Sequence, residues 1–323
     1  MNIQQKARAL GFAALVCAFL LFGFSPLAAQ IATGGITGTV LDPSGAAVPG
    51  ANITLSNVAT GVNSATRSTA TGNYSFSGLP PGTYTIQTSA SGFQNYVVHG
   101  VVVHLQQIQT EDIHLKTGNV QQSVTVTAAA PLVQAESGQI GQTVSNQAVE
   151  NLPLVTRNWG SLAQLSAGVN TAPPGQPTPD SGSTEGAYFS VNGVNVWQND
   201  FRLNGINDNI EIYGGNYTGT NAAIVPPPDA VQEFKVQTGD FNAAFGHSTG
   251  GVINAVVKSG TNSLHGDLWE YIRNDAFNAN CFFCGNKSAE YRQNIFGVTA
   301  GGPIVRNKTF WFFDYQGQRY VTP

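Results

Sequence analysis

The sequence predicts a mainly β protein, and three observations support this prediction. Only 10% of the 323 residues are charged, whereas roughly 25% is usual for a soluble domain. Glycine occurs 37 times, and the many Asn, Thr, Ser and Gln residues favour strands and turns over long helices. Short alternating runs of apolar and polar residues, separated by turns with Pro or Gly, continue through most of the chain. The net charge of −4 supplies no basic field, so no nucleic-acid partner is expected.

The first element, residues 1–29, has the pattern of a secretory signal peptide. Lys6 and Arg8 precede an apolar run from Leu10 to Phe24, and small residues suitable for cleavage lie just before Gln30. The alternative is a retained membrane anchor, but the apolar run of about 15 residues is short for a spanning helix of about 20. The sequence therefore predicts an exported chain.

Residues 30–116 predict a small β-sandwich of about seven strands. The turn at Asp42–Gly45 has a physical basis, because Pro43 sets its own φ and Gly45 accepts a positive one. The polar positions of the alternating runs are Thr, Ser, Asn and Gln, so one face of each sheet is expected to meet water. Strands are expected in Ile36–Val40, Ala51–Leu55, Tyr74–Phe76, Tyr84–Ile86, Tyr96–Val103 and Gln107–Leu115.

The same region resembles the carboxypeptidase-regulatory-like domains. The resemblance implies a prealbumin-like sandwich, a fold sometimes classed with carbohydrate-binding folds. It does not imply peptidase activity, because the chain contains no HxxE or HExxH zinc motif. The matching pieces occur in order at Gly38–Asp42, Val48–Ala51, Gly72–Phe76 and Leu79–Ile86.

Residues 117–135 read as a linker that contains one strand-forming run. The run consists of Ser123, Val124, Thr125, Val126 and Thr127, and small residues and a proline follow it. One interpretation is an edge strand or a plain linker. The other is a segment that a partner protein captures by pairing strand to strand, for which main-chain bonds supply the affinity and side-chain demands are loose.

Residues 136–258 predict a mixed α+β domain. A short helix is expected where Asn158 caps a run with Trp159, Leu162 and Leu165 at three-residue spacing. Strands are expected at Tyr188–Gly193 and Phe201–Ile206, as a pair ending in Asn-Gly turns, and at Glu233–Val236.

The end of this region carries the strongest motif in the chain, and it resembles the end of the plug domain of TonB-dependent outer-membrane receptors. An aromatic-Gly pair precedes a Gly-Gly-Val-Ile-Asn run, and a Lys-Ser-Gly exit follows. Among these receptors the resemblance is greatest to the Oar-like type, which places a regulatory-like sandwich before the plug. The motif residues are Phe245, Gly246, Gly250, Gly251, Val252, Ile253 and Asn254.

The resemblance implies an outer-membrane receptor and transporter, with residues 136–258 as the plug and the sandwich in the periplasm. It makes Ser123–Thr127 the candidate TonB box, the segment that TonB of the inner-membrane energy-coupling complex grips. An external ligand, such as a glycan or a protein, would bind above the plug. Polar plug side chains suit this setting, because the lumen of a membrane barrel is polar. Arg157, Arg202 and Lys235 are expected at the contact between plug and barrel.

Residues 259–323 predict the first strands of an incomplete transmembrane β-barrel. Strands are expected at 264–274, 291–304 and 308–319, each close to the length of a tilted membrane strand. Three strands are too few to close a barrel, which needs about eight, so a truncated chain is expected. A soluble sheet core is the alternative. Lipid-facing and girdle positions are expected among Trp269, Tyr271, Phe310, Trp311, Phe312, Phe313 and Tyr315, but aromatic residues on both faces leave the lipid face unassigned.

The remaining polar residues predict neither an enzyme nor a cofactor or metal site. Cys281 and Cys284 lack a second CxxC for zinc, and in an exported chain they are candidates for a loop disulfide. No nucleophile–base pair stands out. The competing function is a secreted or surface adhesion protein that binds through its carbohydrate-binding-like sandwich. The sequence does not identify a ligand for either function.

Overall fold

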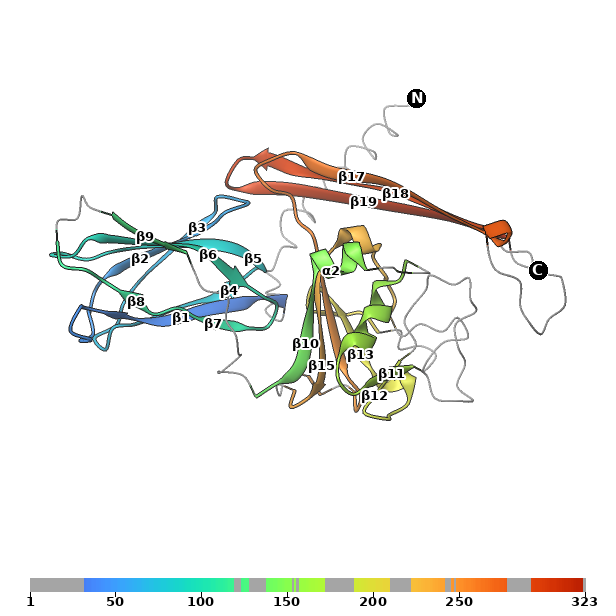
Figure 1. Cartoon of the computed structure of the whole chain (residues 1–323), viewed down its shortest axis with the longest axis horizontal. Helices are drawn as coiled ribbons and strands as arrows, with labels where there is room; N and C mark the ends of the chain where they lie inside the picture. The colour runs from blue at the N-terminus through green and yellow to red at the C-terminus, as the bar shows by residue number, and fades with distance from the viewer. Residues whose placement is uncertain are drawn as a thin grey trace, which may run out of the picture. The chain divides into compact units, whose positions relative to one another are not determined.

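The computed structural model of this chain describes residues 32–118, 123–127, 138–152, 154, 157–171, 189–209, 222–241, 245–246, 248–277 and 292–321. Within these ranges the protein is mainly β, as the sequence predicts, with few and short helices (Figure 1). No helix in the described ranges is both long enough and apolar enough to cross a membrane.

The first group of strands forms two sheets, and we call this part the sandwich. One sheet has the order β4-β1-β7, with β8 also paired to β1, and the other has the order β3-β2-β5-β6-β9. Strand β3 was not expected, because its residues show no apolar alternation and form a strand only by pairing with β2. The strands are β1 Gly34–Leu41, β2 Asn52–Asn57, β3 Asn63–Arg67, β4 Asn73–Leu79, β5 Gly82–Ser89, β6 Asn95–Val103, β7 Ile108–Thr110, β8 Ile113–His114 and β9 Ser123–Thr127.

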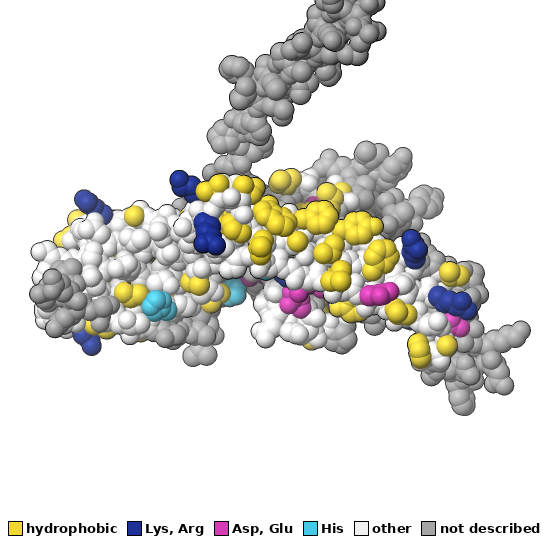
Figure 2. Space-filling model, turned by 90° about the horizontal axis from the view of Figure 1, so that it is seen from above, with side chains coloured by type: hydrophobic (Ala, Val, Ile, Leu, Met, Phe, Trp, Pro, Cys, Tyr) yellow, Lys and Arg dark blue, Asp and Glu magenta, His cyan; other side chains and the backbone are white. Residues whose placement is uncertain are grey.

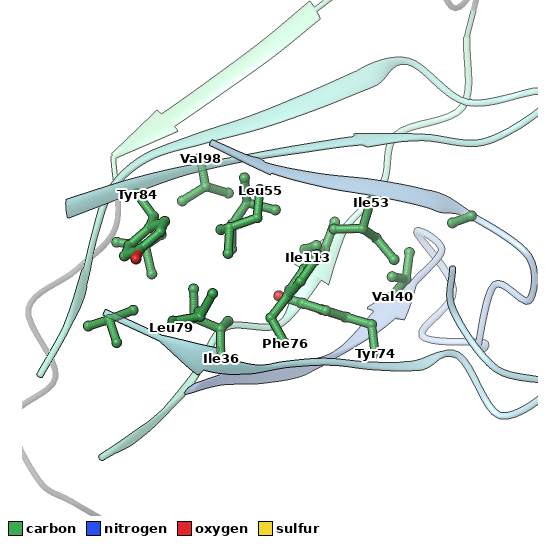
Figure 3. Close-up of a cluster of buried hydrophobic side chains, with 14 of the residues drawn as sticks. Ile36, Val40, Ile53, Leu55, Tyr74, Phe76, Leu79, Tyr84, Val98 and Ile113 are labelled. Atoms are coloured by element: carbon green, nitrogen blue, oxygen red, sulfur yellow. The ribbon is translucent and has the colours of Figure 1, made fainter. Parts of the chain in front are cut away.

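The sandwich core comes from alternate residues of both sheets (Figure 3). Ile36 and Phe76 of one sheet point toward Leu55 and Val98 of the other. Period-two alternation explains this, because successive side chains of a strand lie on opposite faces. Full burial of each such side chain contributes roughly 1.5–3 kcal/mol to the free energy of folding. The sandwich therefore has a hydrophobic core of its own.

The second group, which we call the central region, is built on a five-stranded sheet of order β10-β15-β16-β13-β14. Its hydrophobic core includes Phe234, whose ring centroid lies 4.8 Å from that of Trp159. The elements are β10 Ile140–Ser145, α2 Asn146–Asn151, the 3₁₀ helix η2 Trp159–Leu165, β11 Val169–Thr171, β12 Phe189–Val191, η3 Val196–Gln198, β13 Asp200–Leu203, β14 Ile206–Asn207, η4 Pro228–Ala230, β15 Val231–Gly239 and β16 Val252–Val257.

For the central region, one expectation is confirmed and one needs correction. Asn158 caps the short helix that follows it, its side chain accepting from the Gly160 amide at 2.9 Å; the helix is of the 3₁₀ type and leaves Leu165 54% exposed. The strands at 188–193 and 201–206 do not pair with each other. Strand β12 pairs with β11, while β13 pairs with β14 and β16. Alternation gave the strand positions, but long-range packing selects which strands pair.

The third group is an antiparallel sheet of order β17-β18-β19, which we call the C-terminal sheet. It comprises β17 His265–Asn274, β18 Arg292–Val305 and β19 Thr309–Val321, and the short helix η5 Asp275–Phe277 follows β17. Pairing is continuous from Arg292–Val321 to Pro303–Phe310 between the last two strands. A tight turn joins β18 and β19, in which Asn307 has a φ of 61°. The expected strands at 264–274, 291–304 and 308–319 therefore lie within one or two residues of those observed.

Candidate functional site

The candidate TonB box forms the outermost strand of a sandwich sheet. Residues Ser123–Thr127 make β9, which pairs parallel with the first half of β6, from Asn95 opposite Ser123 to His99 opposite Thr127. β9 is the last strand in the sheet order, and no strand of the described residues pairs with its outer edge. The segment is therefore held on one side and open on the other.

The side chains of β9 continue the alternation of β6. Val124 and Val126 lie opposite Tyr96 and Val98, so they extend the face that carries the sandwich core. Val126 remains 37% exposed, because no further strand of the described residues covers this edge. Both interpretations of the run from the sequence remain compatible with this position: it is an edge strand, and it offers main-chain groups to a partner.

The Gly250–Asn254 part of the plug motif begins the central strand of the five-stranded sheet. Strand β16 pairs parallel with β13 and antiparallel with β15. The amide of Gly250 donates to the Gln198 carbonyl at 2.8 Å, and that of Gly251 donates to Oδ1 of Asn199 at 3.0 Å. A Cβ on Gly250 would clash with the Gln198 carbonyl oxygen and lie 2.6 Å from Oδ1 of Asn199. The absent side chain of Gly250 is thus what lets two backbone segments meet.

The aromatic-Gly pair that opens the motif lies outside the sheet. Phe245 is half-buried, with the guanidinium carbon of Arg202 4.8 Å from its ring centroid. Nε of Arg202 also donates to Oδ2 of the buried Asp200 at 3.0 Å. Gly246 is exposed, and a Cβ there would meet nothing within 4 Å. The motif therefore has a buried, closely packed part at Gly250–Asn254 and a more exposed part at Phe245–Gly246.

A contact that the sequence did not predict joins the sandwich to strand β15. Glu233, which is 5% exposed, accepts from Nδ1 of His104 at 3.0 Å with one carboxylate oxygen and from the Leu105 amide with the other. Nζ of Lys235 donates to the Gln106 carbonyl at 3.1 Å. The residues are separated by more than 100 positions, so no local pattern could have indicated the contact. We call these residues the β6–β15 contact, because the turn at 104–107 directly follows β6.

Two ionisable groups at the β6–β15 contact have shifted pKa values. The hydrogen bond that His104 donates to Glu233 raises the pKa of His104 above its usual 6.5, although burial acts in the opposite direction. Burial lowers the pKa of Lys235 to about 8, although the negative Glu233 opposes the shift. Protonated His104 therefore stabilises the contact below pH 6.5, and this stabilisation is lost as the pH rises through the raised pKa. Lys235 stays charged over that range, and it loses its proton, and with it the cost of burying a charge, only above about pH 8.

We expect His104→Asn to lower the thermal unfolding temperature more at about pH 5.5 than at about pH 7.5, because the charged imidazole gains more from Glu233 than the neutral one does. Melting curves of both proteins at the two pH values measure the difference. His114→Asn, at an exposed position on β8, is the matched control and should show the same small effect at both. An equal loss at both pH values for His104→Asn would contradict the assignment.

The three cations expected between plug and barrel have different partners in the structure. Arg157 does reach the C-terminal sheet, where its guanidinium carbon lies 4.1 Å from the ring centroid of Tyr271, and it also pairs with Asp229. Lys235 contacts the sandwich instead. Arg202 remains within the central region. Of the three, Arg157 is the one for which the structure shows a contact with the C-terminal sheet. A strand position alone does not show which neighbouring element covers a side chain.

The register of the C-terminal sheet separates two faces that the sequence did not. Leu268, Val298 and Tyr315 form one row across the three strands, and Trp269, Gly297 and Gln316 form the adjacent row on the opposite face. The first face carries large exposed apolar side chains, with Leu268 85% exposed. Figure 2 shows hydrophobic side chains gathered in a band on this side of the molecule. Its other members include Ile272, Phe296, Trp311 and Phe313.

The opposite face of the C-terminal sheet is more polar and more covered. It carries Gln293 and Thr299, each 3% exposed, together with Gln318. The aromatic run at 310–313 is divided by the same alternation, so Phe310 and Phe312 lie on this second face. Trp269 also lies here at 9% exposure, where its ring covers Gly297.

The remaining candidate positions add no chemistry in the described part of the chain. Cys281 and Cys284 lie outside the described residues. The described ranges contain no group of three or more His, Cys, Asp or Glu side chains arranged to hold a metal ion. Burial raises the pKa of Asp208 to about 6, and Oδ1 of this carboxyl accepts from the Ile224 amide at 3.1 Å.

Comparison with known proteins finds two matching domains and one similar transporter. The family model of the carboxypeptidase regulatory-like domain matches residues 35–116, and that of an outer membrane beta barrel domain matches residues 256–323. The TonB-dependent transporter Oar of Myxococcus xanthus is 29% identical over 335 residues, which take in 97% of this chain. The chain is similar to TonB-dependent receptors of the Oar-like type, and it carries a carboxypeptidase regulatory-like domain followed by part of an outer membrane beta barrel domain. The outer membrane is accordingly its location.

The chain spans 29% of the length of the Myxococcus protein. Among solved structures, the outer membrane transporter YddB of Escherichia coli is similar with a TM-score of 0.48 and 14% identity, over 57% of this chain and 26% of YddB. The siderophore receptor PirA of Acinetobacter baumannii has a TM-score of 0.41 and 19% identity, over 56% of this chain and 24% of PirA.

Proposed function

We propose that this chain works in an outer-membrane transporter that imports an external ligand with energy delivered by TonB. The C-terminal sheet supplies the observation that carries the proposal: one face gathers most of the large exposed apolar side chains, with Glu270 among them, whereas the other carries more polar side chains, among them the buried Gln293 and Thr299. A membrane barrel has this division, with apolar residues toward lipid and polar residues toward the lumen. A sheet with open edges is not stable in hydrocarbon, so in this proposal the edges of the C-terminal sheet pair with other strands.

In this proposal the central region is the plug. Arg157 contacts Tyr271, which lies on the polar face of the C-terminal sheet, so the central region lies against the face that would line the lumen. The buried polar side chains of β15 and β16 suit that position, because a plug packs in polar surroundings. Ligand would bind on the outer side of this region, and no catalytic step is proposed.

The turns of the C-terminal sheet support an orientation. Only residues 306–308 separate β18 from β19, whereas the longer stretch of sequence 275–291 separates β17 from β18, and outer-membrane barrels have short periplasmic turns and longer external loops. Nδ2 of Asn262, beside the short turn, donates to the Thr60 carbonyl of the sandwich at 2.7 Å and to Oδ1 of Asn307 at 2.6 Å. Both contacts favour a sandwich on the periplasmic side. The Cys281–Cys284 pair would then lie outside the cell, where a disulfide persists.

The coupling segment of this transporter would be Ser123–Thr127. Its main chain is open along the outer edge of β9, and TonB captures such a segment by strand addition. A ligand bound above the plug would then be released inward when TonB pulls. The competing adhesion function is not favoured, because it does not explain why the two faces of the C-terminal sheet differ in composition.

We expect Thr125→Pro to weaken binding of the isolated periplasmic domain of TonB to the detergent-solubilised receptor by at least about tenfold. Proline removes a main-chain donor and interrupts the strand. Thr125→Ser is the matched control and should bind almost as the native chain does, because strand addition reads the main chain. Surface plasmon resonance measures both, and unchanged binding by Thr125→Pro would reject the coupling segment.

A further inference from the structure

The position of β9 raises a question about what happens to the sandwich when the coupling segment is captured. Strand β9 already uses one edge, which pairs with Asn95–His99 of β6. In a parallel pair, the main-chain groups of alternate residues point toward the neighbouring strand, and those of the residues between them point away. A five-residue strand therefore keeps outward-pointing main-chain donors and acceptors while it is paired on its other side.

We propose that β9 stays on the sandwich when the energy-coupling partner binds, so that the sandwich, β9 and a strand of the partner form one continuous sheet. This inference rests on the proposed function and adds to it that the sandwich transmits the pull. The surface concerned is the outer edge of β9, and its occupant is an extended strand of the partner. Strand addition at an edge that is already open breaks no pairing, whereas capture of a detached segment first breaks the five β6–β9 pairs.

Strand β6 connects this edge to the central region. Its first half, Asn95–His99, holds β9, and the turn that directly follows its last residue makes the β6–β15 contact. Glu233 receives two hydrogen bonds from that turn, and Lys235 donates a third to it. A force applied to β9 would thus be transmitted through β6 to β15. Strand β15 pairs with β16, the strand that contains the end of the plug motif.

Strand β6 is held firmly enough in the sandwich to transmit a pulling force. Val98, directly beside Val126, is fully buried in the core, and β6 is paired along β5 on its other side. Tyr96 packs against the same core. Strand β6, which holds β9, is therefore fixed in the sandwich by both its side chains and its main chain.

A disulfide between β6 and β9 tests the inference directly. Val97 and Thr125 are paired neighbours on the solvent side, away from the core face, and Val97→Cys with Thr125→Cys would lock β9 in place. The variant is made in the receptor with Cys281→Ser and Cys284→Ser, so that the new bond is the one formed. Thr54→Cys with Gln87→Cys, a paired position of β2 and β5, is the matched control lock.

We expect the oxidised β6–β9 lock to bind the isolated TonB domain within about twofold of its reduced form, as the control lock does. Loss of binding on oxidation, restored by dithiothreitol, would overturn the inference, because capture would then require β9 to leave the sandwich; the coupling segment itself would stand. Absence of binding in both redox forms of every variant would overturn the proposed function as well.

Hydrogen exchange on the unmodified receptor gives a second measurement that needs no engineered cysteines. Addition of the TonB domain should increase the protection of the β9 amides and leave that of Asn95–His99 unchanged. A loss of protection at Asn95–His99 would show that β6 has been left unpaired and would contradict the inference.

Discussion

Leu268→Arg is expected to prevent outer-membrane assembly of the receptor. Leu268 is 85% exposed at the middle of β17, in one row with Val298 and Tyr315, on the face proposed to meet lipid. An Arg at the middle of a membrane strand costs roughly 2–4 kcal/mol, which lowers the folding equilibrium constant by about one and a half to three orders of magnitude. The measurement is the amount of folded receptor recovered in the outer-membrane fraction of cells that express it.

Asp267→Arg is the matched control for that substitution. Asp267 precedes Leu268 in the same strand, but its side chain lies on the opposite face, in one row with Thr299 and Asp314. A polar lumen accepts a charge at this position, so assembly should stay close to that of the native receptor. If both variants assemble equally well, the exposed apolar face does not meet lipid, and the transporter proposal loses its main support.

Gly250→Ala is expected to destabilise the central region by about 1–3 kcal/mol, since the new methyl group has no space. Its Cβ would clash with the Gln198 carbonyl oxygen, and backbone atoms have little freedom to move away. The hydrogen bond from the Gly250 amide to the same carbonyl would be strained at the same time. The loss is measured as a lower urea midpoint for unfolding, followed by tryptophan fluorescence, because Trp159 is 5% exposed in this core.

Gly246→Ala provides the comparison within the same motif. It adds the same methyl group where no atom lies within 4 Å, so the change in the free energy of unfolding should fall within about 0.5 kcal/mol. If this exposed glycine nevertheless proves essential for ligand uptake, its role lies in function and not in packing. Equal destabilisation by both substitutions would show that the tight approach at Gly250 does not govern stability.

The sequence alone was sufficient for the local features of this protein. Alternation located most sandwich strands, β15 and the three C-terminal strands to within a few residues. The Asn-Gly pairs predicted turns, and Asn204 and Gly205 do adopt positive φ values of 51° and 80° between β13 and β14. The glycines of the plug motif indicated a close backbone approach, which Gly250 makes. These features depend on a few neighbouring residues, so a short stretch of sequence carries the whole signal.

Tertiary structure decided the features that join distant residues. The sequence could not reveal that β12 pairs with β11, that β9 pairs with β6, or that Glu233 meets His104. Nor could the run of aromatic residues at 310–313 show which face is apolar, because both faces carry large rings until pairing with β18 sets the register. The physical reason is that a strand's own pattern defines its two faces, whereas the choice of neighbour and the face that is covered depend on packing over the whole chain.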